Sequence, residues 1–225
     1  MSEILTALGI RKGYRIGREF LEVLKGIDFS LKESEAVGIM GPSGVGKSTL
    51  LHILGGLDRP DQGEILLNGQ NLNQINDGSL AKIRNEKIGF VFQFHHLLPD
   101  FSVIENISLP LRIRGVSQTE ASRRAIDLAS HLGLGDRLNQ KPETLSAGER
   151  QRVAVARAVI TDPIMILADE PTGNLDYDNS IKILDLLRCL NNERKIGLVI
   201  VSHNAIIREF TDHQFQLKGG HLSAL

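Results

Sequence analysis

The stretch Ala36-Val-Gly-Ile-Met-Gly-Pro-Ser-Gly-Val-Gly-Lys-Ser48 decides the fold of this 225-residue chain. Its first five residues predict a buried strand, and Gly41 to Ser48 match the pattern G-x-x-x-x-G-K-[S/T]. A helix is predicted over Ser48–Leu54, ending at Gly55-Gly56. Glycines between a strand and a helix let backbone N–H groups surround phosphate oxygens, and the helix N-terminus adds partial positive charge. The stretch therefore predicts a nucleotide phosphate site.

The polar side chains of this loop have distinct predicted tasks. Lys47 is expected to reach the β- and γ-phosphates, and the Ser48 hydroxyl is expected to bind Mg²⁺. The residues expected to contact the nucleotide are Gly41, Pro42, Ser43, Gly44, Val45, Gly46, Lys47, Ser48 and Thr49.

A second apolar run, Ile164–Ala168, ends in two adjacent acids, Asp169 and Glu170. Open α/β sheets bind ligands at the carboxyl ends of their strands. We therefore expect Asp169 to hold Mg²⁺ and Glu170 to polarise the attacking water as general base. The alternative is a pair of acids that only caps a strand before a turn at Pro171, and the phosphate loop in the same chain argues against it.

Strand and helix patterns alternate along the chain, which favours a parallel α/β sheet. The first 40 residues are expected to form short β segments, with Leu21–Leu24 and Ile27–Leu31 on either side of a turn at Lys25-Gly26. Further strands are predicted at Glu64–Leu67, which a tight turn at Asn68-Gly69 follows, at Ile88–Phe92 and at Leu198–Val201.

Helices are predicted from Phe94 to about Ile160, and again from about Asn179 to Asn191. Capping boxes at Ser117–Glu120 and Ser146–Glu149 are expected to open helices towards His131 and Ala158. We expect one domain over 1–225, with a mostly parallel core sheet, an N-terminal antiparallel β segment and a helical subdomain inserted at approximately 94–160.

Charge, cysteine content and the length of the apolar runs limit the kinds of partner that the chain is expected to have. The formal net charge is −1 with scattered Lys and Arg, so no basic stripe indicates nucleic acid, and we expect none as a partner. The single cysteine, Cys189, excludes a disulfide within the chain. No apolar run reaches the about 18 residues of a membrane span, and the start lacks the pattern of a signal peptide. We expect a cytosolic polypeptide whose membrane role comes through partners.

The run Leu145-Ser-Ala-Gly-Glu-Arg-Gln151 resembles the signature of the ATP-binding cassette (ABC) ATPases. Other elements typical of that family occur in its order over nearly the whole chain: Tyr14, the phosphate loop, Gln93, the signature, the acidic strand, Asp176 and His203. The resemblance implies the ABC ATPase fold, a P-loop NTPase (RecA-like) architecture, with ATP and Mg²⁺ as ligands. It also implies ATP hydrolysis coupled to transport.

The resemblance gives each of these residues a role. Tyr14 would stack on adenine, Gln93 would bind Mg²⁺ or the attacking water, and His203 would contact the γ-phosphate and help position Glu170. Asp176, in the D-loop, would contribute to the nucleotide site. Taken alone, Tyr14 is nearly as well explained by core or surface packing. Taken alone, Gln93 is better explained as an ordinary polar residue at a strand end, and His203 as a satisfied structural group; only the whole set of motifs favours the roles in the site.

Ser146 and Gly148 are expected to act on a second copy of the chain. The helix start after Ser146 offers a cap and an anion site, but many residues separate it from Lys47. The resemblance implies a head-to-tail homodimer, in which each signature closes on the ATP of the other subunit. The resemblance also implies that two integral membrane subunits dock near Gln93–Phe101. Apolar, aromatic and histidine residues there suit an amphipathic helix, and packing between the two lobes is the alternative.

Within the family, 93–101, 51–58 and 168–176 resemble the lipoprotein-releasing branch. That implies a peripheral subunit on the cytoplasmic face of a bacterial inner membrane, which powers transfer of lipoproteins to a periplasmic carrier. Macrolide-type efflux ATPases and FtsE-like regulators of cell-wall remodelling share Gly173-Asn-Leu-Asp176 and are the alternatives. No heptads, second phosphate loop or Asn-Lys-x-Asp element favours DNA repair, translation or GTPase functions.

Three departures from the family pattern are present, of which one is Gly173-Asn-Leu-Asp176 in place of the commonest Ser-Ala-Leu-Asp. The other two lie in the signature and beside His203. Ala147 replaces the usual signature glycine, which adds a methyl group and removes access to positive φ. Ser202-His203-Asn204 replaces the more usual Thr-His-Asp or Thr-His-Glu. Neither change touches a phosphate ligand or the base, so we expect activity to survive.

Overall fold

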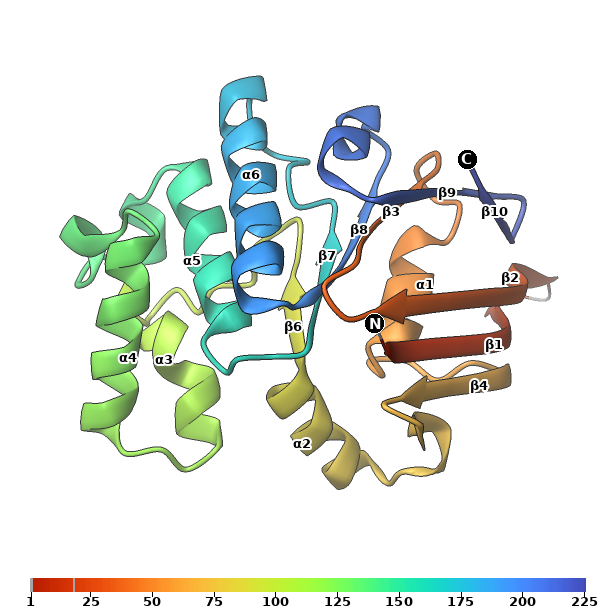
Figure 1. The fold of residues 1–225 in the computed structure, drawn as a ribbon, viewed down its shortest axis with the longest axis horizontal. Helices are drawn as coiled ribbons and strands as arrows, with labels where there is room; N and C mark the ends of the chain where they lie inside the picture. The colour runs from red at the N-terminus through yellow and green to blue at the C-terminus, as the bar shows by residue number, and fades with distance from the viewer. Residues whose placement is uncertain (1, 18) are drawn as a thin grey trace.

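Across residues 2–17 and 19–225, which the computed structural model describes, the chain forms two β-sheets and six α-helices (Figure 1). The larger sheet has the order β10-β9-β3-β8-β7-β6. Its strands are β3 (Ala36–Met40), β6 (Ile88–Val91), β7 (Met165–Asp169), β8 (Gly197–Ser202), β9 (His213–Lys218) and β10 (His221–Ala224). All neighbours run parallel except β9 and β10. The predicted mostly parallel core sheet is confirmed.

The central strands are apolar throughout because both faces of the larger sheet are buried. Alternate residues enter two different cores, as the period of two in a strand requires. In β7, Ile166 and Ala168 pack with the helices, whereas Met165 and Leu167 pack beneath the second sheet. The apolar runs at 36–40, 164–168 and 198–201 were therefore correctly predicted as strands.

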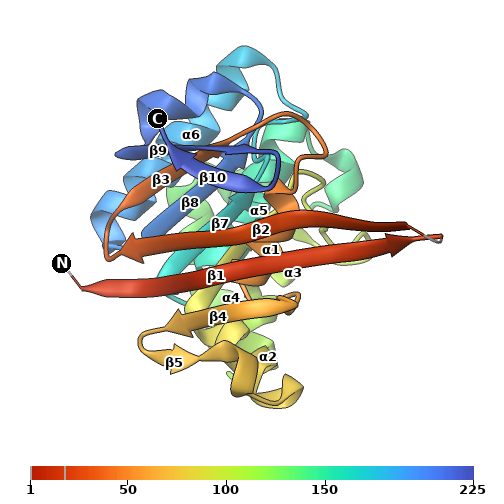
Figure 2. The same ribbon diagram turned by 90° about the vertical axis from the view of Figure 1, so that its right-hand side faces the viewer.

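The second sheet is antiparallel, with the order β2-β1-β4-β5, and lies across the larger one (Figure 2). Its strands are β1 (Glu3–Ile16), β2 (Glu19–Lys32), β4 (Gln62–Leu67) and β5 (Gln70–Asn71). The predicted N-terminal antiparallel segment is confirmed, and Asn68-Gly69 makes the predicted turn with positive φ at both residues.

The expected turn at Lys25-Gly26 is wrong. Strand β2 runs without a break through these residues, because Lys25 pairs with Arg11 and Ile27 pairs with Ile10. Gly26, with φ of 79°, is the extra residue of a β-bulge. A glycine within a strand pattern is equally compatible with a bulge and with a turn. Here it is a bulge, because pairing with β1 continues on both sides of Gly26.

The helices are α1 (Lys47–Leu54), α2 (Asp77–Lys87), α3 (Val103–Ile113), α4 (Gln118–His131), α5 (Ala147–Val159) and α6 (Tyr177–Arg194). Helix α6 starts earlier and ends later than its sequence pattern predicted, and α2 and the β9–β10 hairpin had no prediction. No helix in the described ranges is long and apolar enough to cross a membrane.

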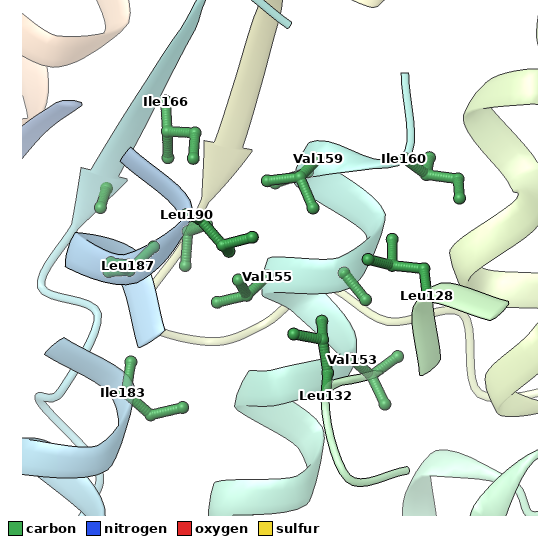
Figure 3. Close-up of a cluster of buried hydrophobic side chains, with 14 of the residues drawn as sticks. Leu128, Leu132, Val153, Val155, Val159, Ile160, Ile166, Ile183, Leu187 and Leu190 are labelled. Atoms are coloured by element: carbon green, nitrogen blue, oxygen red, sulfur yellow. The ribbon is translucent and has the colours of Figure 1, made fainter. Parts of the chain in front are cut away.

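Helices α3, α4 and α5 lie together on one side of the larger sheet (Figure 1). Buried side chains from α4, α5, α6 and β7 form a continuous cluster that joins them to the sheet (Figure 3). Ser146 opens α5 with both halves of the predicted capping box. Ser117 opens α4 with only one half, because the Glu120 carboxylate binds Arg123 instead of turning back to the cap.

Candidate active site

Four neighbouring parallel strands bring the predicted site together. In the order β3-β8-β7-β6, their carboxyl ends lead into the loop at Gly41, into His203, into Glu170 and towards Gln93. The ends of parallel strands meet at one edge of a sheet, which is where such folds bind ligands. The topology thus places residues from 41 to 203 around one point.

The glycines of the phosphate loop are required by close approach and by backbone conformation. Gly46, the residue before α1, has φ of 107°, and a Cβ there would lie 2.5 Å from Val23 Cγ1. A Cβ on Gly41 would lie 2.6 Å from the Leu217 carbonyl oxygen. Gly44 also has positive φ, at 75°. Glycine avoids close contacts at Gly41 and Gly46 and backbone strain at Gly44 and Gly46, so these residues suit the tight turn of a phosphate-binding loop.

Lys47 is held inside this loop. Its ammonium group donates to the carbonyl oxygens of Gly41, at 2.9 Å, and Pro42, at 3.1 Å. It also lies 3.3 Å from Glu170 Oε1, and its side chain is only 6% exposed. A buried cation surrounded by a phosphate-binding loop is suited to a polyphosphate ligand.

Asp169 ends β7 and carries a buried oxygen atom with no hydrogen-bond partner, Oδ1, among the described residues. Burial raises the pKa of this carboxyl above its usual value, against the opposing effect of a hydrogen bond from Ser48. An unpartnered carboxylate oxygen beside a hydroxyl is a hard oxygen ligand set of the kind that Mg²⁺ prefers. These two residues therefore fit the predicted metal.

Glu170, with φ of 44°, is fixed by four contacts. Its carboxylate accepts hydrogen bonds from the Ser202 hydroxyl at 2.8 Å and the His203 backbone N–H at 3.0 Å, and His203 Nδ1 lies 3.0 Å from Oε2. Burial raises its pKa, but the hydrogen bonds from His203 and Ser202, together with the Lys47 charge, lower it below the usual value overall. The carboxylate is therefore ionised at neutral pH, as a general base must be.

Tyr14 and Gln93 both line the cavity that contains the phosphate loop. This cavity has a volume of about 380 Å³ and is also lined by Val23, Ser43, Gly44, Gly46, Lys47, Ser48, Thr49 and Glu170. The Tyr14 ring is 39% exposed, which argues against core packing. The Gln93 amide packs against Gly173, where a Cβ would lie 2.7 Å from Nε2.

Ser146, Gly148 and Asp176 are not among the described residues that line this cavity. Ser146 caps α5, and its hydroxyl accepts the Glu149 N–H at 3.3 Å. A Cβ on Gly148 would lie 3.1 Å from Asn179 Oδ1, and the Asp176 carboxylate accepts both the backbone and side-chain N–H groups of that asparagine. The structure thus joins the signature to the D-loop through Asn179 and leaves both apart from Lys47.

Ala147 is the first residue of α5 and therefore has right-handed helical backbone. The replacement of glycine by alanine was expected to remove access to positive φ. That has no consequence here, because residue 147 does not adopt a positive φ.

The segment after Gln93 exposes apolar side chains and is tied to α5. Phe94 is 69% exposed, and Leu98 and Phe101 are also exposed. His95 and His96 both have positive φ, and the Arg157 guanidinium donates to both of their carbonyl oxygens at 2.6 Å.

Two residues of the site have no role predicted from the sequence, Val23 and Ser202. Val23 packs against Gly46, and the Ser202 hydroxyl donates a hydrogen bond to Glu170. Only Ser202 had a usable signal, since it directly precedes His203 at the end of a predicted strand.

Comparison with known proteins agrees with this arrangement. The family model described as "ABC transporter" matches residues 24–173. Proteins named "Lipoprotein-releasing system ATP-binding protein LolD" are 48% identical in Psychrobacter arcticus, over 98% of both chains, and 45% identical in Geobacter metallireducens, over 100% of both. That of Legionella pneumophila is 46% identical over 98% of this chain and 97% of the relative.

Two solved structures of one ATP-binding cassette are also similar. The dimeric structure of this bacterial ABC transporter cassette has a TM-score of 0.90 and 40% identity, over 97% of this chain and 96% of the other. A dimeric post-hydrolysis state bound to ADP and Pi has a TM-score of 0.90 and 39% identity, over 98% of each chain.

Proposed function

The chain belongs to the ABC transporter family, and we propose that it is the ATP-hydrolysing subunit of a complex that releases lipoproteins from a bacterial inner membrane. Hydrolysis rests on one observation: the phosphate loop with Lys47 and the ionised Glu170 line one cavity, and Asp169, with its unpartnered carboxylate oxygen, lies beside the Ser48 hydroxyl of that loop. The lipoprotein substrate rests on the full-length similarity to relatives that carry that name.

Each residue of the site has a task in hydrolysis. The loop amides and Lys47 bind and orient the phosphates, which supplies most of the catalysis in phosphoryl transfer. Ser48 and Asp169 would hold Mg²⁺, which neutralises charge on the phosphates when bound. Glu170 accepts a proton from the attacking water, while Ser202 and His203 hold its carboxylate in place.

We also propose that two copies form a head-to-tail dimer. The Ser146 cap and the α5 N-terminus are an anion site apart from the phosphate cavity of their own chain. A second cavity of about 260 Å³ is lined by Glu170 and His203 and, from the D-loop region, by Thr172, Gly173, Leu175, Ser180 and the exposed Tyr177. In a head-to-tail dimer, the anion site of each copy would close on the phosphate cavity of the other copy, next to this second cavity.

Complementation between inactive variants tests this arrangement. Lys47→Ala inactivates one half of a site, and Ser146→Arg blocks the other half. In a mixed dimer both lesions fall in one composite site, so the second site is intact. Random mixing should restore about a quarter of the parental sites. If the mixture stays as inactive as either variant alone, the head-to-tail arrangement is wrong.

Membrane subunits are proposed to dock on the segment Gln93–Phe101. Beside it, a largely apolar cavity of about 410 Å³ is lined by residues of α2, β6, α3 and α5, including Phe90, Phe92, Ile113 and Arg157. An exposed apolar surface next to a groove suits an amphipathic helix. Docking there would keep the chain on the cytoplasmic face of the inner membrane as a peripheral subunit.

The substrate is tested with the complete complex. The chain is co-purified from membranes with its integral partners, which are identified, and ATPase activity is measured with and without added lipoprotein in proteoliposomes. We expect stimulation and release of lipoprotein in the parent and neither with Glu170→Gln. Recovery of cell-division proteins or stimulation by a macrolide in place of lipoprotein would support the alternative branches and reject this one.

A further inference from the structure

A cluster of polar side chains fixes the position of Tyr14 at the rim of the nucleotide cavity. The Tyr14 hydroxyl donates to Asp58 Oδ2 at 3.1 Å. Lys12 Nζ donates to Asp58 Oδ1 at 2.8 Å and to the Arg59 carbonyl oxygen at 2.7 Å. Both oxygens of one carboxylate are thus used, one for the ring and one for the cation on the same strand.

The backbone on either side of Tyr14 is held by the same loop. The Gly13 N–H donates to Asp61 Oδ2 at 2.8 Å, and the Asp61 N–H donates to the Arg11 carbonyl oxygen at 2.9 Å. Lys12 Nζ also lies 5.4 Å from the centre of the Tyr14 ring. The segment 11–14 of β1 is therefore clamped to the loop 58–61 through backbone and side chains together.

The ion pair between Lys12 and Asp58 is partly shielded from water. The Lys12 side chain is 12% exposed and that of Asp58 is 35% exposed. Burial opposes both charges, yet the mutual hydrogen bond and attraction raise the pKa of Lys12 and lower that of Asp58. Both groups stay ionised at neutral pH, so the contacts are charge-assisted hydrogen bonds, which are stronger than neutral ones.

The contacts between residues 11–14 and 58–61, here called the clamp, are connected to α1, the helix that begins in the phosphate loop. The N–H groups of Leu57 and Asp58 donate to the His52 carbonyl oxygen in the last turn of α1. The first residue of α1 is Lys47. An eight-residue helix is about 12 Å long, so α1 carries the phosphate site at one end and the support of the Tyr14 ring at the other.

We propose that Asp58, together with Lys12, is the positioning residue for the nucleotide base: it fixes the Tyr14 ring as a preformed stacking platform beside the phosphate loop. The inference rests on the proposed binding of ATP. A ring whose hydroxyl and flanking backbone are already held loses little freedom when a base stacks on it. The platform would therefore act on the base, since Tyr14 lines the cavity and neither Lys12 nor Asp58 is among the described residues that do.

Two ligands separate a base effect from a phosphate effect. Dissociation constants for ATP and for inorganic tripolyphosphate, both with Mg²⁺, are measured calorimetrically for the parent, Asp58→Ala, Tyr14→Phe and Tyr14→Ala. Glu22→Gln is the matched control, since this carboxylate pairs with Arg11 on the same hairpin but does not line the cavity. Tyr14→Phe keeps the ring and removes only its hydrogen bond to Asp58.

We expect Tyr14→Ala to weaken ATP binding roughly 5- to 100-fold, the effect of losing one base–aromatic stack. Asp58→Ala should weaken it about 3- to 10-fold and Tyr14→Phe about 2- to 4-fold, as the platform loses its preorganisation. Tripolyphosphate binding should change by less than about 2-fold in all variants. In steady-state assays the loss should fall on KM, with kcat near the parental value.

Three outcomes would contradict, in turn, the role of the clamp, its action on the base and the proposed ATPase function. If Asp58→Ala and Tyr14→Phe bind ATP like the parent while Tyr14→Ala does not, the ring stacks without the clamp and the inference fails. If both ligands weaken equally in Asp58→Ala, Asp58 supports the phosphate loop and not the base. If the parent binds neither ligand, the proposed ATPase function itself is rejected.

Discussion

The Lys47 ammonium lies 3.3 Å from the Glu170 carboxylate, so the cation of the phosphate loop is neutralised by the predicted general base. Both side chains are largely buried, with exposed fractions of 6% and 12%. An incoming phosphate competes with Glu170 for this cation, because both are anions that seek the same ammonium group. Binding of the nucleotide should therefore weaken the contact between Lys47 and Glu170, while Ser202 and His203 keep the carboxylate in place.

Glu170→Gln should keep ATP binding and nearly abolish turnover. The amide cannot accept a proton from water, so phosphate release should fall roughly 10²- to 10⁴-fold. Since the change also removes the anion beside Lys47, ATP should bind at least as tightly as in the parent. Calorimetry and phosphate release measure the two effects, and size-exclusion chromatography with ATP should show a trapped dimer. Glu64→Gln, at an exposed position on β4, is the control; parental turnover by Glu170→Gln would reject the base assignment.

Asp169→Asn should remove the magnesium-dependent part of nucleotide binding. At a ligand concentration of 100 times Kd, binding stabilises a protein by about 2.7 kcal/mol. The melting temperature with ATP is measured in the presence of Mg²⁺ and in the presence of EDTA. We expect Mg²⁺ to raise it further in the parent and to leave it unchanged in the variant.

The same measurement without nucleotide controls for misfolding. Asp169 Oδ1 has no partner among the described residues, so loss of its charge should not lower the melting temperature. The exposed Asp77→Asn should retain the Mg²⁺ increment. An Asp169→Asn protein that keeps the increment would remove Asp169 from the metal site.

Glu149→Gln should make the free energy of unfolding less dependent on pH in the acidic range. The Arg137 hydrogen bond, followed by those at Ser146, lowers the pKa of Glu149 from 4.5 to about 2. Because the folded pKa lies below the unfolded one, its contribution is present above about pH 4.5 and lost as pH falls towards 2. Glutamine keeps the capping box and removes the charge.

The free energy of unfolding should fall by about 0.5–1 kcal/mol at pH 7 in this variant. The difference from the parent should vanish between pH 4.5 and 2, as urea unfolding at several pH values can measure. Glu120→Gln removes a carboxylate from a more exposed pair with Arg123 and should change the curve less. Parallel curves for Glu149→Gln and the parent would contradict the prediction.

Asn106→Ala should destabilise the fold and the proposed docking segment together. Asn106 is fully buried, accepts the Leu98 N–H and donates to the carbonyl oxygens of Leu98, Phe101 and Ser102. The change leaves these backbone groups without their partner, which should cost about 2–4 kcal/mol in chemical unfolding. Asn139→Ala, at an exposed position, should cost less than about 0.5 kcal/mol. Equal costs for the two variants would show that the buried network contributes nothing.

Local patterns made part of the fold predictable. The run from Ala36 to Leu54 contains a strand, a loop and a helix that were each predictable, because an apolar stretch, a glycine-rich motif and a helix end at Gly55-Gly56 are patterns of neighbouring residues. The same is true of Ser146–Glu149, where the cap and its partner are three residues apart. The bulge at Gly26 was not predictable, because it depends on a partner strand about fifteen residues away.

By itself, the sequence determined the phosphate loop, the acidic strand end and the signature, since each is a contiguous string whose chemistry lies in its own residues. Only the tertiary structure decided that Glu170 is held by Ser202 and His203, that Lys47 contacts Glu170 and that Asp58 supports Tyr14. These pairs lie between 32 and 123 positions apart. The order of the parallel strands and the crossing of the second sheet bring them together, and no local periodicity encodes that order.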